Sequence, residues 1–354
     1  MSFQSKVRDR DVFKDSYGRI FTVLGYIQPP DRILSILKYV PDPSGRWASG
    51  GISYQRVFWG GVDSVVKGAE ELPPEYLITD SHFGTVLVEP PREAVSEYFK
   101  PEHRLKEILS EGPRDILEER VHHLTNSLHD NLGISIDRLG VAGSILWRGH
   151  NPDFSDINMN IYGLSSTKVL REHLAQLQEV DSRLKLRKIS DWANAMSRVQ
   201  TRIPLLSDRD LQMIFSRRNA VCVDGQCVGI TPVLYPDEAP IKYSTERYIT
   251  LDKRPITILA TITDSKYSLF HPSLYVIEPV MHDSCEGGMI DRLMVYDGAF
   301  GGLFHEGDEI EVSGTLQRVE YNGEVTGYQL MIGTKEGFGK EFIRPVNQFH
   351  RNYQ

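Results

Sequence analysis

The sequence lacks three features that would place the chain outside the ordinary globular class. Only 3 of its 354 residues are cysteine, which rules out a framework of several disulfides as the source of stability. No apolar run approaches the roughly 20 residues that a membrane-spanning helix needs. Residues 1–10 are too polar for a signal peptide. We therefore expect a cytoplasmic protein that does not have the membrane as a partner.

The chain also lacks an excess of positive charge. Its 48 acidic residues outnumber its 40 basic residues, which gives a formal net charge of −8. A protein that binds nucleic acid over its whole surface is basic, so RNA would have to bind a local patch. Residues 335–351 are the most basic short stretch and the best local place for RNA. The cations of this stretch are Lys335, Lys340, Arg344 and Arg351.

What is present is an ordinary mixture of 40% hydrophobic and 25% charged residues, in a chain long enough for two or three domains. The sequence predicts an α+β protein. We expect an α+β N-terminal domain over residues 1–100 and a central domain over residues 101–236. The acidic, proline-containing stretch 236–240 would link it to a small β-barrel over residues 241–354.

Local patterns predict helices and strands within these regions. Residues 32–40 fit a helix face, although a strand is also compatible with them. Residues 92–132 predict helices, and the last of these ends at Gly133. Its buried stripe consists of Leu117, Val121, Leu124 and Leu128. The nearby His122, His123 and His129 lie off this stripe, and we interpret them as surface residues rather than metal ligands.

The most informative stretch is residues 136–163, which predicts a strand, a tight turn, a short helix, a loop and a second strand. Gly143 follows the first strand, and without a Cβ it lets the backbone approach a bound phosphate. Ser144 would cap the short helix, whose exposed N–H groups attract anions. Gly149 would end that helix.

The second strand alternates polar and apolar residues with a period of two. Its polar face would carry Asp156, Asn158 and Asn160, and its apolar face Ile157, Met159 and Ile161. Two carboxylates spaced by two on one strand face can bridge two magnesium ions. Here the second of these positions holds an amide, which can bind magnesium through its oxygen but brings no charge.

This order of elements resembles the nucleotidyltransferase fold of the DNA polymerase beta superfamily. That pattern is Gly-Ser, a short helix, and an Asp-x-Asp pair on the next strand. The resemblance implies that Gly143 and Ser144 hold a nucleoside triphosphate and that Asp156 is the first magnesium ligand. Asn158 would be a weakened second ligand, and Arg148 could contact the phosphates. The layout of the whole chain also looks like a group of archaeal proteins labelled predicted nucleotidyltransferases, whose function is not settled.

The resemblance implies a third carboxylate on the strand after the following helices. Residues 229–234 occupy that place and contain no acid, while Asp224 lies in a predicted turn. One hypothesis is therefore a magnesium-dependent nucleotidyltransferase with a degenerate metal site, in which Asp156 and Asn158 are catalytic and a hydroxyl group accepts the nucleotide. The alternative is a non-catalytic nucleotide- or RNA-binding module that kept the fold. A carboxylate beside Asp156, from Asp153 or Asp224, would favour the enzyme.

A third interpretation, a scaffold for protein interactions, stays open, as does the oligomeric state. The C-terminal region predicts five short strands with glycine-rich turns, including a hairpin turn at Asn322-Gly323. This pattern is typical of an OB-like barrel. Such barrels bind single-stranded nucleic acid through aromatic and basic side chains. This one is rich in acids, so a scaffold or dimerisation barrel is equally compatible with the sequence.

A second turn signal is Asp224-Gly225, which is flanked by Cys222 and Cys227. A two-residue turn would place the two cysteines opposite each other on neighbouring strands, close enough for a disulfide. Cytosolic thiols are usually reduced. Both the thiol and the disulfide state therefore stay open at this point.

Overall fold

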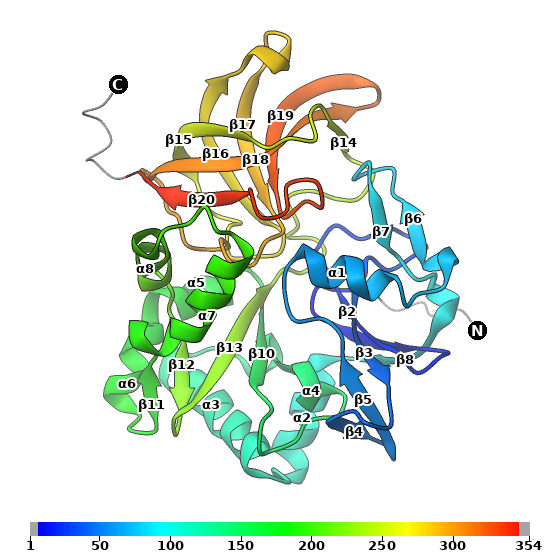
Figure 1. Ribbon diagram of the computed structural model, residues 1–354. Helices are drawn as coiled ribbons and strands as arrows, with labels where there is room; N and C mark the ends of the chain where they lie inside the picture. Colours follow the sequence, from blue (N-terminus) through cyan, green and yellow to red (C-terminus); the bar gives the residue numbers. More distant parts are fainter. Residues whose placement is uncertain (1–5, 347–354) are drawn as a thin grey trace.

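The computed structural model describes residues 6–346 and shows a mixed α+β protein (Figure 1). The α+β class expected from the sequence is confirmed. Three main sheets occupy different parts of the molecule: an N-terminal sheet, a central sheet covered by helices, and a curled C-terminal sheet. No helix within residues 6–346 is long and apolar enough to cross a membrane.

The N-terminal sheet has six strands in the order β4-β5-β3-β2-β1-β8, all antiparallel to their neighbours. The strands are β1 (Val12–Asp15), β2 (Ile20–Val23), β3 (Ser35–Pro41), β4 (Trp47–Ser49), β5 (Ile52–Arg56) and β8 (Val95–Phe99). Helix α1 (Val62–Ala69) and a small sheet of β6 (Leu77–Thr79) and β7 (Val86–Val88) complete this part. The helix favoured over residues 32–40 is wrong, because strand β3 forms there, and residues 95–99 are strand rather than helix.

The central part follows the predicted order of helices and strands. Its helices are α2 (Pro101–Glu111), α3 (Ile116–Leu132), α4 (Gly143–Leu146), α5 (Leu164–His173), α6 (Leu177–Val180), α7 (Ala193–Arg202) and α8 (Asp208–Ser216). Its strands are β9 (Leu139–Ala142), β10 (Ile157–Tyr162), β11 (Leu184–Leu186), β12 (Val221–Val223) and β13 (Gln226–Val233). The sheet order is β11-β12-β13-β10-β9, and only the β10–β13 pair is parallel.

Helix α3 illustrates how local sequence determines these elements. The Asp115 carboxylate accepts hydrogen bonds from the backbone N–H groups of Leu117 and Glu118, which satisfies two otherwise unpaired donors at the helix start. Gly133 ends the helix in a left-handed conformation, with φ at 65°. The predicted stripe of Leu117, Val121, Leu124 and Leu128 is fully buried against the sheet, so this prediction is confirmed.

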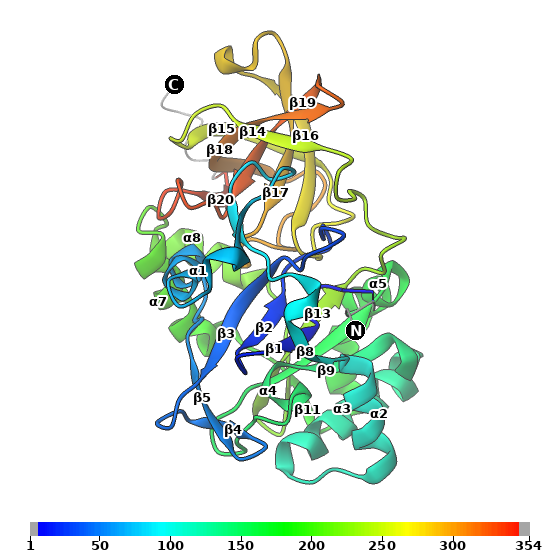
Figure 2. The same ribbon diagram turned by 90° about the vertical axis from the view of Figure 1, so that its right-hand side faces the viewer.

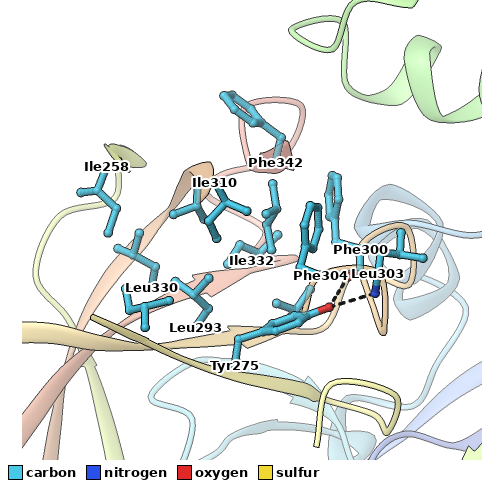
Figure 3. Packing of buried hydrophobic residues seen from close by; sticks show 14 of the residues in the cluster. Ile258, Tyr275, Leu293, Phe300, Leu303, Phe304, Ile310, Leu330, Ile332 and Phe342 are labelled. Atoms are coloured by element: carbon cyan, nitrogen blue, oxygen red, sulfur yellow. Dashed lines mark hydrogen bonds between the residues drawn. The ribbon is translucent and has the colours of Figure 1, made fainter. Parts of the chain in front are cut away.

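The C-terminal sheet contains β14 (Arg247–Thr250), β15 (Ile256–Asp264), β16 (Ser273–Met281), β17 (Met289–Val295), β18 (Glu309–Tyr321), β19 (Glu324–Ile332) and β20 (Phe342–Pro345). Pairing runs from β15 through β16, β17, β19 and β18 and returns to β15, with β17 and β19 parallel. The predicted Asn322-Gly323 turn is present, and both residues have positive φ. Figure 3 shows the packed interior, where the Tyr275 hydroxyl donates to the Phe300 carbonyl at 2.8 Å and accepts from the Leu303 N–H at 3.3 Å.

The three parts share apolar cores. Trp147, directly after α4, packs against Tyr39 and Tyr54 of the N-terminal sheet, with ring centroids 5.1 and 5.2 Å apart. Leu211 and Phe215 of α8 belong to the same buried cluster as the interior of the C-terminal sheet. The N-terminal sheet is therefore held against the predicted turn-and-strand motif.

The short 3-10 turns are η1 (Pro74–Tyr76), η2 (Arg92–Ala94), η3 (Ile136–Arg138), η4 (Leu174–Gln176), η5 (Ile189–Trp192) and η6 (Asp283–Cys285).

Candidate functional site around Asp156

Strand β10 has the apolar face that the sequence predicts, while Asn160 of the predicted polar face is fully buried. Ile157, Met159 and Ile161 are fully buried in the core beneath the helices. The other face begins with Asp156, which is exposed and directly precedes the strand, and continues with the half-buried Asn158. The period of two along β10 therefore places one carboxylate and one amide on the same face.

The Asn158 side chain lies between two glycines. Gly143 has φ at 62°, and a methyl group at that position would lie 2.9 Å from Asn158 Nδ2. Gly229 pairs with Asn158 across the parallel strands, and a methyl group there would lie 3.0 Å from Oδ1. Contacts this short force a shift, so the missing side chains of both glycines make room for the amide. Glycine at position 143 thus avoids a strained backbone conformation and a close contact with the Asn158 amide.

Two of the sequence predictions about the short helix are wrong. Ala142 is the residue before α4, and no side chain caps the helix start. Ser144 lies within the first turn of the helix and is buried, so its hydroxyl is not in the capping position. The helix ends at Leu146 rather than at Gly149, because the chain turns at Trp147 to bury its indole.

Arg148 forms an ion pair with a carboxylate of α2. Its backbone is left-handed, with φ at 58°, and its guanidinium pairs with Glu107 of α2 at 2.8 Å. Arg217 and Arg218 are also engaged elsewhere: Arg217 pairs with Asp308, and Arg218 donates to the backbone carbonyl of Ala299 at 2.5 Å. The last two arginines therefore hold α8 against the C-terminal sheet.

The two extra carboxylates considered from the sequence lie in turns. Asp153 is exposed in the turn that precedes β10, and its backbone N–H donates to the Asn151 side chain. Asp224 lies in the β12–β13 turn and pairs with Arg183 at 2.6 Å. The Asp224 carboxylate is therefore held by an ion pair within residues 6–346.

Within residues 6–346, one group of three acidic or histidine side chains is close enough to hold a metal ion: Asp115, Glu118 and His150. Its members already have structural partners. Asp115 caps α3 and lies 2.7 Å from His150 Nε2, while Glu118 pairs with Arg104. Of the three histidines on α3, His123 pairs with Asp181 at 2.8 Å. These contacts explain the residues by helix packing rather than by metal binding.

Lys38 is the unexpected component of the site. It lies on β3, half-buried, and burial together with the nearby charges of Arg56 and Arg10 lowers its pKa to about 7. The Asp156 carboxylate acts in the opposite direction, because a negative charge stabilises the protonated amine. The N-terminal sheet therefore carries an amine whose charge interacts with the first carboxylate of the predicted metal site. The only signal in the sequence is a lysine within the apolar run of residues 36–40.

A second cation that interacts with Asp156 belongs to the central part. The negative charge of Asp156 acts to raise the pKa of Arg187, whose Nε has no hydrogen-bond partner among the described residues. Burial lowers the pKa of Arg187, and its guanidinium stacks on Trp192 at 3.7 Å from the ring centroid. The Asp156 charge thus acts on a lysine of β3 and on an arginine directly after β11, and neither forms an ion pair with it within residues 6–346.

The residues around Asp156 do not fit a pair of magnesium ions. Such a centre needs several carboxylates that neutralise and bridge the metals. This site offers one carboxylate, the uncharged amide of Asn158, and a glycine at position 229. The charges that interact with Asp156 from Lys38 and Arg187 are positive, which disfavours binding of further cations. We therefore derive no chemical step through magnesium.

The β12–β13 hairpin next to the site contains a disulfide. Cys222 and Cys227 are directly opposite each other and are joined, with Cα atoms 3.9 Å apart. The turn between them is Asp224-Gly225, and both residues have positive φ. The hairpin geometry predicted from the sequence is confirmed, and the disulfide state is the one present.

Comparisons with protein-family models, curated proteins and solved structures find no match to the chain. The chemistry of the site must therefore be inferred from its own residues. Those residues combine one exposed carboxylate, a half-buried amide between glycines, and the cations Lys38 and Arg187, whose charges interact with the carboxylate.

Proposed function

We propose that the chain is a nucleotidyltransferase-like protein whose central part binds the phosphate groups of a nucleotide or of RNA without catalysing two-metal transfer. The observation that carries this proposal is the group of interacting cations Lys38, Arg56 and Arg10, in which the charge of Lys38 also interacts with that of Asp156. Positive charge supplied by side chains replaces the charge that magnesium ions supply in a two-metal enzyme.

The arrangement of elements supports the nucleotidyltransferase-like assignment. Helix α3 leads into β9, the turn at Gly143 leads into α4, and Asp156 opens β10, which lies between β9 and β13 in the sheet. This is the order that the resemblance implies. The glycines on both sides of Asn158 support loss of catalysis, because the second carboxylate is an amide and its neighbour on β13 has no side chain.

The charge around Asp156 supports an anionic ligand. Arg10, Lys38 and Arg56 repel one another, and this repulsion contributes to the lowered pKa of Lys38. A bound phosphate would relieve that repulsion and favour the charged amine. Asp156 opposes the cations with a single negative charge, so a ligand with two or more charges complements the site best.

The C-terminal sheet supports an OB-like assignment. Its circuit of β15, β16, β17, β19 and β18, with β17 parallel to β19, is the order of a five-stranded OB barrel. We do not assign RNA binding to its exposed face, because acids dominate there, as the next subsection describes. Of the basic stretch expected to bind RNA, Arg344 pairs with Glu311 at 2.9 Å, and residues 347–354 lie outside the described part.

Calorimetric titration tests the proposal. ATP, GTP, CTP, UTP and a short oligouridine are titrated with and without magnesium into wild type, Lys38→Met and the control Lys266→Met, which alters an exposed lysine in the turn after β15. We expect binding that does not require magnesium, that is lost or weakened by about tenfold in Lys38→Met, and that is unchanged in the control.

Two other outcomes would overturn the proposal. Magnesium-dependent binding that is lost in Asp156→Ala would favour the enzyme, and a labelled-nucleotide transfer assay would then follow. Absence of binding to any nucleotide or to oligouridine would remove both nucleotide hypotheses and leave the scaffold.

A further inference from the structure

A shallow groove lies on the C-terminal barrel, away from Asp156. It has a volume of about 390 Å³ and lies between residues of the β16–β17 and β18–β19 hairpins. In both views these hairpins are at the end of the barrel turned away from α3 (Figures 1 and 2). The groove is lined by Pro279, Gly288, Met289, Asp291, Val325, Thr326, Gly327 and Tyr328.

Several large apolar side chains in and beside the groove are exposed to solvent. Met289 and Val325 both line it and are 47% and 50% exposed. Met281 pairs with Met289 across the hairpin and is 74% exposed, whereas the next pair inward contains the fully buried Ile290. Clustered exposed apolar residues indicate an interaction surface, and methionine adapts its shape to different partners.

Unpaired acids surround these apolar side chains. Asp291 lines the groove, Glu324 directly precedes the lining residue Val325, and Glu286 lies two residues before the lining residue Gly288. All three are exposed, and none forms an ion pair with another residue of the described part of the chain. The neighbouring cations are already used: Arg292 pairs with Glu246 at 2.8 Å and Arg318 with Glu320 at 2.8 Å.

Two glycines give the groove its shape. The Tyr328 ring lies over Gly288, where a methyl group would come within 2.3 Å of the ring. A methyl group at Gly327 would contact the Asp291 carboxylate at 3.9 Å and would partly fill the space beside it. The opening next to Asp291 is therefore kept free by the absence of a side chain.

We propose that this groove is the docking site for a protein segment that carries lysine or arginine next to large apolar side chains. Apolar side chains of the partner would cover Met289 and Val325, and its cations would pair with Asp291, Glu286 and Glu324. Complementary charge at the border of an apolar contact sets the specificity and the association rate. The same acids repel a phosphate backbone, so nucleic acid does not bind this face.

A peptide-binding experiment with the full chain tests the proposal. The ligand is a short fluorescent peptide of lysine and leucine, and anisotropy is measured for wild type, Val325→Asp and the charge reversal Asp291→Lys/Glu324→Lys. The control Asp237→Lys/Glu306→Lys makes the same change in net charge at exposed positions outside the groove. We expect affinity to fall by about tenfold or more in both groove variants and to stay near the wild-type value in the control.

Two comparisons separate docking from general electrostatic attraction. A peptide with serine in place of leucine should lose most of its affinity, because the apolar contact is removed. A short oligouridine should compete no better than buffer for the labelled peptide. Equal weakening in the control variant, equal binding of the serine peptide, or displacement by oligouridine would each overturn the proposal. The substituted residues are exposed, so the variants should fold, which circular dichroism checks.

Discussion

A methyl group added at Gly143 would lie 2.9 Å from Asn158 Nδ2. Gly143, in the turn after β9, and Asn158, on β10, are therefore direct neighbours. A larger residue at either position would displace the side chain or backbone of the other. The relationship explains why glycine is needed in the turn even though Ser144 does not cap the helix.

The first prediction concerns Gly143→Ala. It should lower the free energy of unfolding by about 2–4 kcal/mol, because a left-handed conformation and a steric clash are both imposed. Gly133→Ala is the matched control: its φ is 65°, close to the 62° of Gly143, but nothing lies within 4 Å of an added methyl group. It should cost about 1–2 kcal/mol. Urea denaturation measures both, and adding Asn158→Ala to Gly143→Ala should recover part of the loss.

The second prediction concerns pH and Lys38. Because its pKa is about 7, phosphate binding should weaken as pH rises from 6 to 8, when the amine loses its charge. Lys38→Arg should abolish this change, since arginine stays charged. The ordinary pKa of lysine is 10.5, so between pH 7 and 10.5 the unfolded chain binds more protons and stability should rise with pH. A pH-independent affinity in wild type would contradict a role for Lys38.

The third prediction concerns a buried acid pair, Glu89 and Asp80. Burial and the adjacent Asp80 carboxylate raise the pKa of Glu89 to about 8 from an ordinary 4.5. Between pH 4.5 and 8, the folded chain therefore keeps a proton on Glu89 that the unfolded chain has already released. Stability should fall as pH rises through that window and then level off. Denaturation across this range should show a smaller slope for Glu89→Gln, whereas the exposed Glu97→Gln should behave as wild type.

The fourth prediction concerns the Cys222–Cys227 disulfide. Replacing both cysteines by alanine should lower the free energy of unfolding by about 2 kcal/mol without reductant, as expected for a short closed loop. With reductant, wild type should become as unstable as the double variant. Cys285 is a buried free thiol, so Cys285→Ala should lose the same amount in both conditions. Identical stability of wild type with and without reductant would contradict a stabilising disulfide.

The parts of the fold that could be predicted depend on local sequence. Helix α3 has its cap, apolar stripe and terminal glycine within residues 115–133. The faces of β10 follow from strict alternation, and the hairpin turn at residues 322–323 follows from residues that accept positive φ. In each case nearby residues determine the conformation, so a short window contains the necessary information.

The parts that were missed depend on contacts distant in the sequence. Strand β3 carries apolar residues that fit a helix face equally well, and only pairing with β2 and β5 selects the strand. The charge interaction between Lys38 and Asp156 depends on the packing of Trp147 against Tyr39 and Tyr54, which joins the N-terminal sheet to the central part. Nothing near Lys38 in the sequence indicates that interaction.

Strand β18 pairs with four strands: β14 and β15 before it in the chain, and β19 and β20 after it. During synthesis, β15, β16 and β17 therefore emerge before the strands that pair with their free edges. Strand β18 pairs with β15, and β19 pairs in parallel with β17. The N-terminal sheet has all of its strands by Phe99. The barrel should accordingly be the last part of the molecule to fold on the ribosome. It is also the part whose unpaired edges remain longest exposed to chaperones and to aggregation.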